Sequence, residues 1–451
     1  MLLGALLLAA AGFVVFSPVP LGTWMSGPRD ALWLALGENP HPVKLMVPAD
    51  TPLSAVALLG VRLFHDPSLS GSGRMSCASC HDPTLAYGPA GSLPVVMGGL
   101  HVTTPGFRSV PSLRYLYRQP AFTIGPDVEN GNDVVVPLTQ QAQAATGHAR
   151  VLKTALTPQA AATNLVPQGG LFWDGRADTL EQQVNGPLYN PAEMDGGTLQ
   201  EVARKLATGP YAAQLQQLFG AGLLQNPGMT VDEAMFAIGR YQIEDQSFHP
   251  FTSKYDAWLE GKARLTRMEL AGYLLFNDPA KGNCAACHLD QPGRDGTPPL
   301  FTDHQFEALG APRNPAIPAN RDPNYYDLGI CGPYRIDMRA STQYCAMFLT
   351  PTLRNVALRR VFFHNGVFRS LEQVLDFYVD RDIHPELFYP RDAAGRVMKY
   401  NDIPPQYRAN VDTVDAPFDR HPGDQPALTP GEIQDVIAFL DTLTDGYTKS
   451  R

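Results

Sequence analysis

Two copies of the pattern C-x-x-C-H limit what this chain can fold into more than any other feature. They read CASCH over residues 77–81 and CAACH over residues 284–288. In c-type cytochromes the two thiols bond to the vinyl groups of a haem, and the adjacent histidine becomes the proximal ligand of its iron. The spacing therefore predicts two covalently bound haem c groups. The predicted attachment residues and proximal ligands are Cys77, Cys80 and His81 in the first motif, and Cys284, Cys287 and His288 in the second.

Two other uses of these cysteines stay open at this point. A C-x-x-C pair can be a redox-active dithiol that happens to precede a histidine. Four cysteines can also hold a zinc ion with tetrahedral geometry, although a joint zinc site would leave both histidines without a role. Because the five-residue pattern occurs twice, we favour haem.

The composition is that of a globular chain. Of the 451 residues, 44% are hydrophobic and 18% are charged, and the net charge is −9. No run of lysine or arginine occurs, so we expect no nucleic-acid partner.

The first residues predict export. Residues 2–16 are almost entirely apolar, which is short for a membrane span of about 20 residues and typical of a signal-peptide core. No basic residue precedes them and no clean cleavage site follows. Residues 1–20 are therefore either a signal peptide or an N-terminal anchor that tethers the protein to a membrane. Both place the rest of the chain in the periplasm, either secreted or held at the outer face of the inner membrane.

Two further cysteines lie in a loop-like stretch of the second half. In an oxidising compartment we expect Cys331 and Cys345 to form a disulfide. Two free thiols are the alternative.

The chain is a diverged duplication. The pattern G-x-x-L-F-x-D-P precedes each haem motif, over residues 60–67 and 272–279. Apolar residues recur around both glycines at i, i+3, i+4 and i+7, as on a helix. We predict an all-α fold of two cytochrome-c-like helical domains, each holding one c-type haem, with long loops. The predicted domains span residues 45–250 and 251–451.

Two segments do not follow this repeat. Residues 119–170 are polar and irregular, and we interpret them as an insertion in the first domain. Residues 380–428 are rich in proline and aspartate, and we expect a wrapping loop there.

Capping signals predict where helices begin. The last helix is expected to end at Gly446. The predicted starts are Thr51 with Pro52, Thr266 with Glu269, Ser370 with Gln373, and Thr429 with Glu432.

Longer stretches resemble the bacterial di-haem cytochrome c peroxidase and MauG family. The resemblance runs from about residue 47 to residue 447. It implies an enzyme whose N-terminal haem reacts with hydrogen peroxide and whose C-terminal haem passes electrons. The implied electron source is a small cytochrome, a copper protein or a side chain of a protein substrate. The motifs are LFHDPSLSGSGRMSCASCH, RSVPSL, LFWDGRADTLEQQVNGPLYNPAEM, YDAWLEG, TPTLRNVALRRVFFHNGVFRSLEQVLDFY and LTPGEIQDVIAFLDTLT.

The same motifs imply roles for individual side chains. FWDGR places the tryptophan between the haems at Trp173, and NPAEM places the acid–base glutamate at Glu193, with Pro187 six positions before it. The distal ligand of the second haem falls at Tyr378, as in MauG, where the peroxidases carry methionine. Met347 is the alternative ligand. Without the motifs, Trp173 and Tyr378 would be interpreted as core residues and Glu193 as a solvated one.

Two features do not follow the family's pattern clearly: the residues at its calcium site and the role of His101. The family's interdomain calcium would lie near Ser109, Arg359 and Val361, and an arginine is unfavourable beside a cation. Whether the protein binds a calcium ion is therefore left open by the sequence. His101 stands where a removable distal histidine of the peroxidases would lie, and we favour an ordinary surface histidine.

A different class of function also fits the haem motifs. A non-catalytic di-haem electron-transfer cytochrome would have two six-coordinate irons and no role for Glu193.

Overall fold

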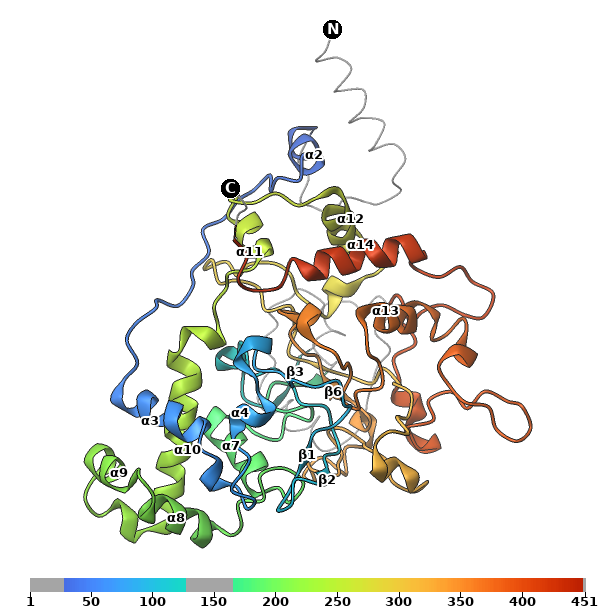
Figure 1. Cartoon of the computed structure of the whole chain (residues 1–451). Helices are drawn as coiled ribbons and strands as arrows, with labels where there is room; N and C mark the ends of the chain where they lie inside the picture. Colours follow the sequence, from blue (N-terminus) through green and yellow to red (C-terminus); the bar gives the residue numbers. More distant parts are fainter. Residues whose placement is uncertain (1–27, 127–164, 449–451) are drawn as a thin grey trace.

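The computed structural model describes residues 28–126 and 165–448, which form a mostly helical molecule (Figure 1). The α-helices are α2 (Pro28–Ala35), α3 (Ala55–Phe64), α4 (Cys77–Cys80), α7 (Leu180–Tyr189), α8 (Leu199–Thr208), α9 (Ala212–Phe219), α10 (Pro227–Glu244), α11 (Lys254–Leu259), α12 (Arg267–Asn277), α13 (Leu371–Asp380) and α14 (Pro430–Asp441).

Short strands modify the predicted all-α class. The described strands form antiparallel pairs of two, which join loops rather than build a sheet core. They are β1 (Met97–Gly98) with β2 (Thr104–Pro105), β3 (Thr123–Pro126) with β4 (Leu165–Gln168), and β5 (Phe306–Glu307) with β6 (Phe348–Leu349). The fold is therefore mostly α.

Two separate hydrophobic cores organise the helices. The first core is built from α3, α7, α8, α9 and α10, and the second from α11, α12, α13 and α14. In Figure 1 the first group lies at the lower left and the second lies above it. Each core therefore contains one copy of the G-x-x-L-F repeat.

The repeat glycines explain how each core closes. Gly60 of α3 faces the backbone of α10, and Gly272 of α12 faces the backbone of α14. A Cβ on Gly60 would overlap the Ala237 carbonyl oxygen, and one on Gly272 would overlap the Asp435 carbonyl oxygen. The same helix crossing thus occurs in both halves, and it requires a residue without a side chain.

Three of the predicted helix starts are confirmed. Thr266 and Glu269 form the predicted capping box of α12, and Thr429 and Glu432 form that of α14. The Ser370 side chain caps α13, as predicted.

Two predicted helix ends are wrong, because distant residues decide them. Helix α3 begins after Ser54 instead of at Thr51, since the Ser54 hydroxyl accepts the capping hydrogen bond from the Ala57 amide at 3.1 Å. The Glu244 carboxylate holds this cap by accepting from the Ser54 amide (2.8 Å) and hydroxyl (3.0 Å). Helix α14 ends at Asp441 instead of Gly446. The chain beyond it turns so that Asp445 accepts a hydrogen bond from Arg114 at 3.0 Å.

The segment before α3 connects the two cores. The Trp258 indole donates to the Gly37 carbonyl at 3.0 Å, and Leu45 packs in the second core. The chain then crosses to the first core at α3 (Figure 1). Leu45, the first residue of the predicted first domain, thus packs in the second core.

The two irregular segments have defined anchor points. Most of the predicted insertion, residues 127–164, lies outside the described residues, and its flanks pair as β3 and β4. Residues 381–428 contain short 3₁₀ turns and irregular chain. The buried Arg381 holds this segment by donating to the carbonyl oxygens of Leu309 and Asp412.

The predicted export segment, residues 1–20, lies outside the described residues. Within the ranges 28–126 and 165–448, no helix is both long and apolar enough to cross a membrane.

The glycine crossings predict a clear stability effect. Gly272→Ala should destabilise the protein by about 1–3 kcal/mol, because it forces a methyl group into a closed backbone contact. The thermal midpoint of the far-ultraviolet circular dichroism should fall accordingly. Gly431→Ala is the matched control, since a Cβ there meets no atom within 4 Å. Equal midpoints for the two variants would contradict this account of the crossing.

Candidate active site

The first C-x-x-C-H motif forms a short helix and presents its histidine in one tautomer. Helix α4 carries Cys77 and Cys80, and the His81 ring Nδ1 lies 2.9 Å from the Tyr87 carbonyl oxygen. A carbonyl only accepts hydrogen bonds, so Nδ1 carries the proton and the lone pair is on Nε2. Burial lowers the pKa of His81 to about 4. The neutral ring is therefore ready to ligate a metal through Nε2.

The second motif has the same arrangement. Residues Cys284–Ala286 form a 3₁₀ turn, and the His288 Nδ1 lies 2.9 Å from the Phe301 carbonyl oxygen. Burial lowers the pKa of His288 to about 4 as well. A histidine that ligates a metal through one ring nitrogen commonly donates its other ring N–H to a carbonyl, which fixes the orientation of the ring.

The thiols do not fit the alternatives to haem. None of the four motif cysteines forms a disulfide. Burial raises the pKa of the Cys77 and Cys284 thiols to about 12, whereas a redox-active dithiol depends on a lowered thiol pKa. Among the residues that the structure describes, no three His, Cys, Asp or Glu side chains gather as a metal site, which excludes a joint zinc site. The residues present fit two covalently held haems.

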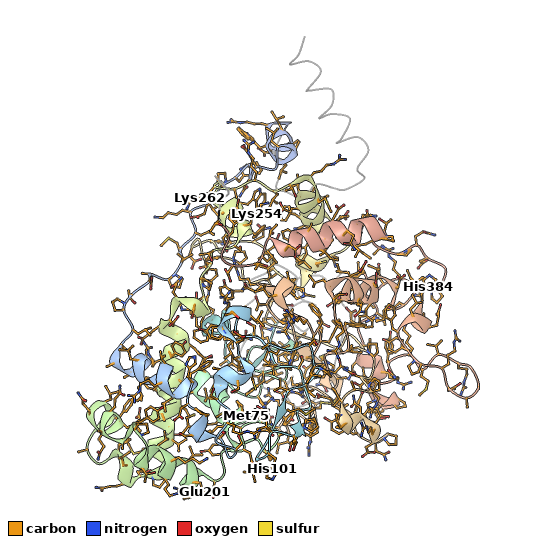
Figure 2. All side chains as sticks on the ribbon, viewed as in Figure 1. Met75, His101, Glu201, Lys254, Lys262 and His384 are labelled. Carbon is orange, nitrogen blue, oxygen red and sulfur yellow. A yellow bond between two sulfur atoms is a disulfide. The ribbon has the colours of Figure 1, made fainter. Side chains whose placement is uncertain are left out.

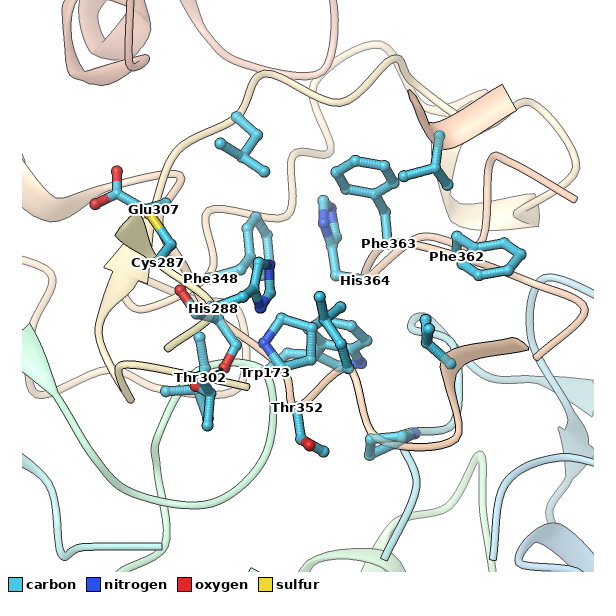
Figure 3. A pocket seen from close by; sticks show the side chains of 18 of the residues that line it. Trp173, Cys287, His288, Thr302, Glu307, Phe348, Thr352, Phe362, Phe363 and His364 are labelled. Atoms are coloured by element: carbon cyan, nitrogen blue, oxygen red, sulfur yellow. Dashed lines mark hydrogen bonds between the residues drawn. The ribbon is translucent and has the colours of Figure 1, made fainter. Parts of the chain in front are cut away.

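A cavity of about 290 Å³ lies against the second motif. Its lining includes Leu85 and Pro111 from the first half and His288 and Tyr378 from the second half. In Figure 3 the side chains of Trp173, His288 and His364 face this space. The cavity therefore joins the surroundings of both motifs.

Trp173 is held rigidly in this lining. Its indole Nε1 donates to the Ser109 carbonyl at 2.9 Å, and its own carbonyl accepts from the Leu349 amide at 2.9 Å. The first contact stays within the first half, and the second reaches the second half. The side chain that the FWDGR motif singles out thus lies where the halves meet.

Glu193 lies near the first motif. The side-chain amide of Asn190 donates a hydrogen bond to the Glu193 carboxylate at 2.6 Å. Its charge reaches Cys80, whose thiol pKa is raised to about 11 by burial and by this carboxylate. Burial also raises the pKa of Glu193, and the Arg176 charge opposes that rise. A carboxyl with a raised pKa holds a proton more readily than an ordinary carboxylate, which suits a group that must both take up and release one.

Pro187 helps to build the turn that carries Glu193. It lies in the last turn of α7, and its carbonyl accepts a hydrogen bond from the Met194 amide at 3.0 Å. The Glu193 carbonyl in turn accepts from the Gly99 amide at 2.7 Å, which attaches the β1–β2 hairpin to the same turn.

The two candidate distal ligands of the second site lie in different places. Tyr378 projects from α13 into the cavity lining, and burial raises its pKa. Met347 packs instead in a buried cluster with Phe306 and the Cys331–Cys345 disulfide, outside the cavity lining. The structure thus brings Tyr378, and not Met347, to the cavity that His288 lines.

The predicted calcium ligands do not fit a calcium ion. The Ser109 hydroxyl donates to the Phe363 carbonyl at 2.6 Å. The Arg359 guanidinium donates to the carbonyl oxygens of Val361 (3.3 Å) and Val110 (3.1 Å). Burial lowers the pKa of Arg359 to about 10, so it remains charged at neutral pH. Calcium requires six to eight oxygen ligands, and here a buried cation of the chain itself already holds these carbonyls.

His101 is exposed on the turn between β1 and β2. Figure 2 shows it near the lower edge of the molecule. In this structure it is a surface histidine.

Two cavity residues were not assigned by sequence reasoning. The His364 ring stacks on Phe348 with ring centroids 3.5 Å apart, and the His364 carbonyl accepts from the Ser109 amide at 2.7 Å. The FFHNG stretch was the available signal for His364. No local pattern marks Phe348.

Comparisons with known proteins identify the family. A model of di-haem cytochrome c peroxidase matches residues 54–264. The methylamine utilization protein MauG of Paracoccus denitrificans is 30% identical over 409 residues, covering 88% of this chain and 90% of MauG. The chain belongs to the di-haem cytochrome c peroxidase and MauG family. It is accordingly an oxidoreductase, and haem is the cofactor that the family implies.

Both branches of the family are represented among its relatives. The cytochrome c551 peroxidase of Nitrosomonas europaea is 28% identical over 356 residues, covering 76% of this chain and 77% of that protein. The crystal structure of the diheme peroxidase BthA from Burkholderia thailandensis matches with a TM-score of 0.73 and 36% identity, over 90% of this chain and 89% of BthA.

The Arg359 contacts predict the metal content. Elemental analysis of the purified holoprotein should find two irons per chain and calcium far below one ion per chain, because a guanidinium replaces the calcium. The chelator EGTA should leave the haem absorption spectrum and the thermal midpoint unchanged. Stoichiometric calcium, or a spectrum that EGTA alters and added calcium restores, would contradict this interpretation.

Proposed function

We propose that this chain is a peroxide-dependent di-haem oxidoreductase. Cys77, Cys80 and His81 would hold the haem that supplies the peroxide-reacting centre, and Cys284, Cys287 and His288 would hold the haem that supplies electrons. The single observation that carries the proposal is Glu193, a half-buried carboxyl beside the first motif that accepts a hydrogen bond from the Asn190 side chain and has a raised pKa. An electron-transfer cytochrome has no use for such a group.

The bound haem iron supplies the redox centre at which peroxide is reduced. The protein supplies the proton transfer. Glu193 accepts a proton from the incoming peroxide and returns it to the departing oxygen, so one carboxyl serves as base and then as acid. The amide of Asn190 fixes the orientation of the carboxylate, and the Arg176 charge limits how far burial raises its pKa.

Trp173 is the proposed route for electrons between the two sites. Its ring belongs to the cavity lining, and hydrogen bonds fix it to both halves of the chain. A rigid aromatic ring in this place suits electron transfer, because it moves little when its charge changes.

Tyr378 is the proposed distal oxygen ligand of the second iron. Burial keeps the free phenol protonated at neutral pH. Ferric iron is a strong local positive charge and would hold the ligand as tyrosinate, as metals do for coordinating thiols. A tyrosine ligand favours the MauG-like branch, in which a side chain of a partner protein is oxidised. Peroxide scavenging with a small cytochrome or copper protein as electron donor is the alternative.

We place this activity in the periplasm. The Cys331–Cys345 disulfide supports an oxidising compartment. The apolar residues 2–16 support export, either as a cleaved signal or as an anchor.

Replacing Glu193 tests the proposed proton transfer. Glu193→Gln should slow the reaction with peroxide by about 10²–10⁴-fold, the usual worth of a positioned acid–base group. Stopped-flow absorbance at the Soret band measures this rate. The wild-type rate should fall as the pH drops through the raised pKa of Glu193, because the base becomes protonated, and the variant should lack this decline. A variant as fast as the wild type would remove Glu193 from the mechanism.

Replacing Tyr378 tests the proposed ligand. Tyr378→Phe should convert the low-spin haem to a five-coordinate or water-bound form, seen in the low-temperature ferric EPR spectrum. Met347→Leu is the matched control and should leave that spectrum unchanged. The reverse pattern would assign the protein to the methionine-ligated peroxidases. Two low-spin haems in the wild type would instead favour an electron-transfer cytochrome or a form that needs prior reduction.

A further inference from the structure

The disulfide-closed loop of the second half, residues 331–345, docks against the first half. Arg335 donates through Nη1 to the carbonyl oxygens of Asp174 (3.1 Å) and Gly175 (2.8 Å). Its guanidinium also lies 3.6 Å from the centroid of the Phe122 ring. These contacts hold the loop on the FWDGR segment, the same segment that carries Trp173.

This docking places Tyr334 over the charged groups beside Glu193. The Tyr334 ring centroid lies 5.2 Å from the Arg108 guanidinium and 5.0 Å from that of Arg176, and it meets the Phe107 ring edge-on at 5.9 Å. Contacts of cations with an aromatic face at this range are attractive. The ring is therefore fixed by the two arginines whose charges act on Glu193.

The Tyr334 hydroxyl lies at the Asn190–Glu193 pair. It interacts with the Asn190 side chain and is in the field of the Glu193 carboxylate. Burial and that carboxylate raise the pKa of Tyr334 to about 12, so the phenol keeps its proton at neutral pH. Asn190 in turn donates to Glu193 at 2.6 Å. Three side chains from two halves of the chain thus form one polar series.

We propose that Tyr334 is a positioning residue for the peroxide reaction. From the disulfide loop of the second half it holds Asn190, and through Asn190 it holds Glu193 in the orientation that proton transfer needs. The loop is thereby a part of the peroxide site. This inference rests on the proposed function, because it assigns Glu193 the acid–base role.

Tyr334→Phe tests the inference while keeping the ring and its packing. The bimolecular rate constant with peroxide should fall about 10-fold to 100-fold, the usual effect of a misplaced catalytic group. The Asn190 contact lowers the pKa of Glu193, so loosening it should raise that pKa. The acid limb of the pH–rate profile should therefore move to higher pH. Asn190→Ala breaks the same series at its middle and should give the same loss and the same shift.

Tyr325→Phe is the matched control. Tyr325 also contacts Phe107, with ring centroids 6.0 Å apart, but its buried hydroxyl finds no hydrogen-bond partner among the residues that the structure describes. Removing that hydroxyl should leave both the rate constant and the pH profile unchanged. A loss equal to that of Tyr334→Phe would show a general effect of disturbing the aromatic packing around Phe107 and would overturn the specific role of Tyr334.

A double-variant cycle separates this inference from the proposed function. In a Glu193→Gln background, Tyr334→Phe should change the rate constant by less than about twofold, since residues that act through one another are not additive. The same loss in both backgrounds would overturn the inference. So would a slow Glu193→Gln variant alongside a Tyr334→Phe variant with the wild-type rate and pH profile. A fast Glu193→Gln variant would overturn the proposed function, and the positioning role with it.

Discussion

A buried guanidinium joins the two halves of the molecule at the site. Arg108 donates through Nε and Nη2 to Asp327 of the second half and through Nη1 to Asp174 of the first half, each at 2.7 Å. Although burial opposes it, the Arg108 charge holds the pKa of Asp327 below its usual range. Removing one partner of such a network leaves buried charge without compensation, which is strongly destabilising. The next residue, Ser109, accepts the Trp173 hydrogen bond, so the same bridge also positions the proposed electron route.

The two predicted haem sites have similar histidines but differ in the other side chains near them, Glu193 at the first and Tyr378 at the second. Both histidines are buried and neutral and point Nδ1 at a backbone carbonyl. The glycine crossings behind them are also equivalent. Glu193 lies near the first motif, whereas Tyr378 lines the cavity with His288 at the second. A duplicated scaffold thus presents two similar histidines, and the residues proposed to set the chemistry of each site come from elements outside the repeat.

Sequence reasoning succeeded where the signal was local. The capping boxes of α12 and α14 depend on residues a few positions apart, and the family motifs led to the correct family and enzyme class. The haem attachment residues of the C-x-x-C-H motifs stay predictions. Sequence reasoning failed where a distant residue decides. Ser54, the cap of α3, is held by Glu244 from the end of α10, and no pattern near Tyr334 indicates Asn190. Arg359 was noted as unfavourable for calcium, but its bond to Val110 required the folded chain.

The β3–β4 pair has a consequence for how this fold tolerates change. Pro126 and Leu165 are register partners, so the chain leaves the body and returns to it at neighbouring points of one ribbon. The entropic cost of bringing two points of a chain together grows only with the logarithm of the number of residues between them, by about 0.6 kcal/mol for each doubling. Changing the number of residues between Pro126 and Leu165 should therefore have little effect on the stability of the two cores. The pairing register of the ribbon itself, and not the number of residues between its strands, holds Pro126 beside Leu165.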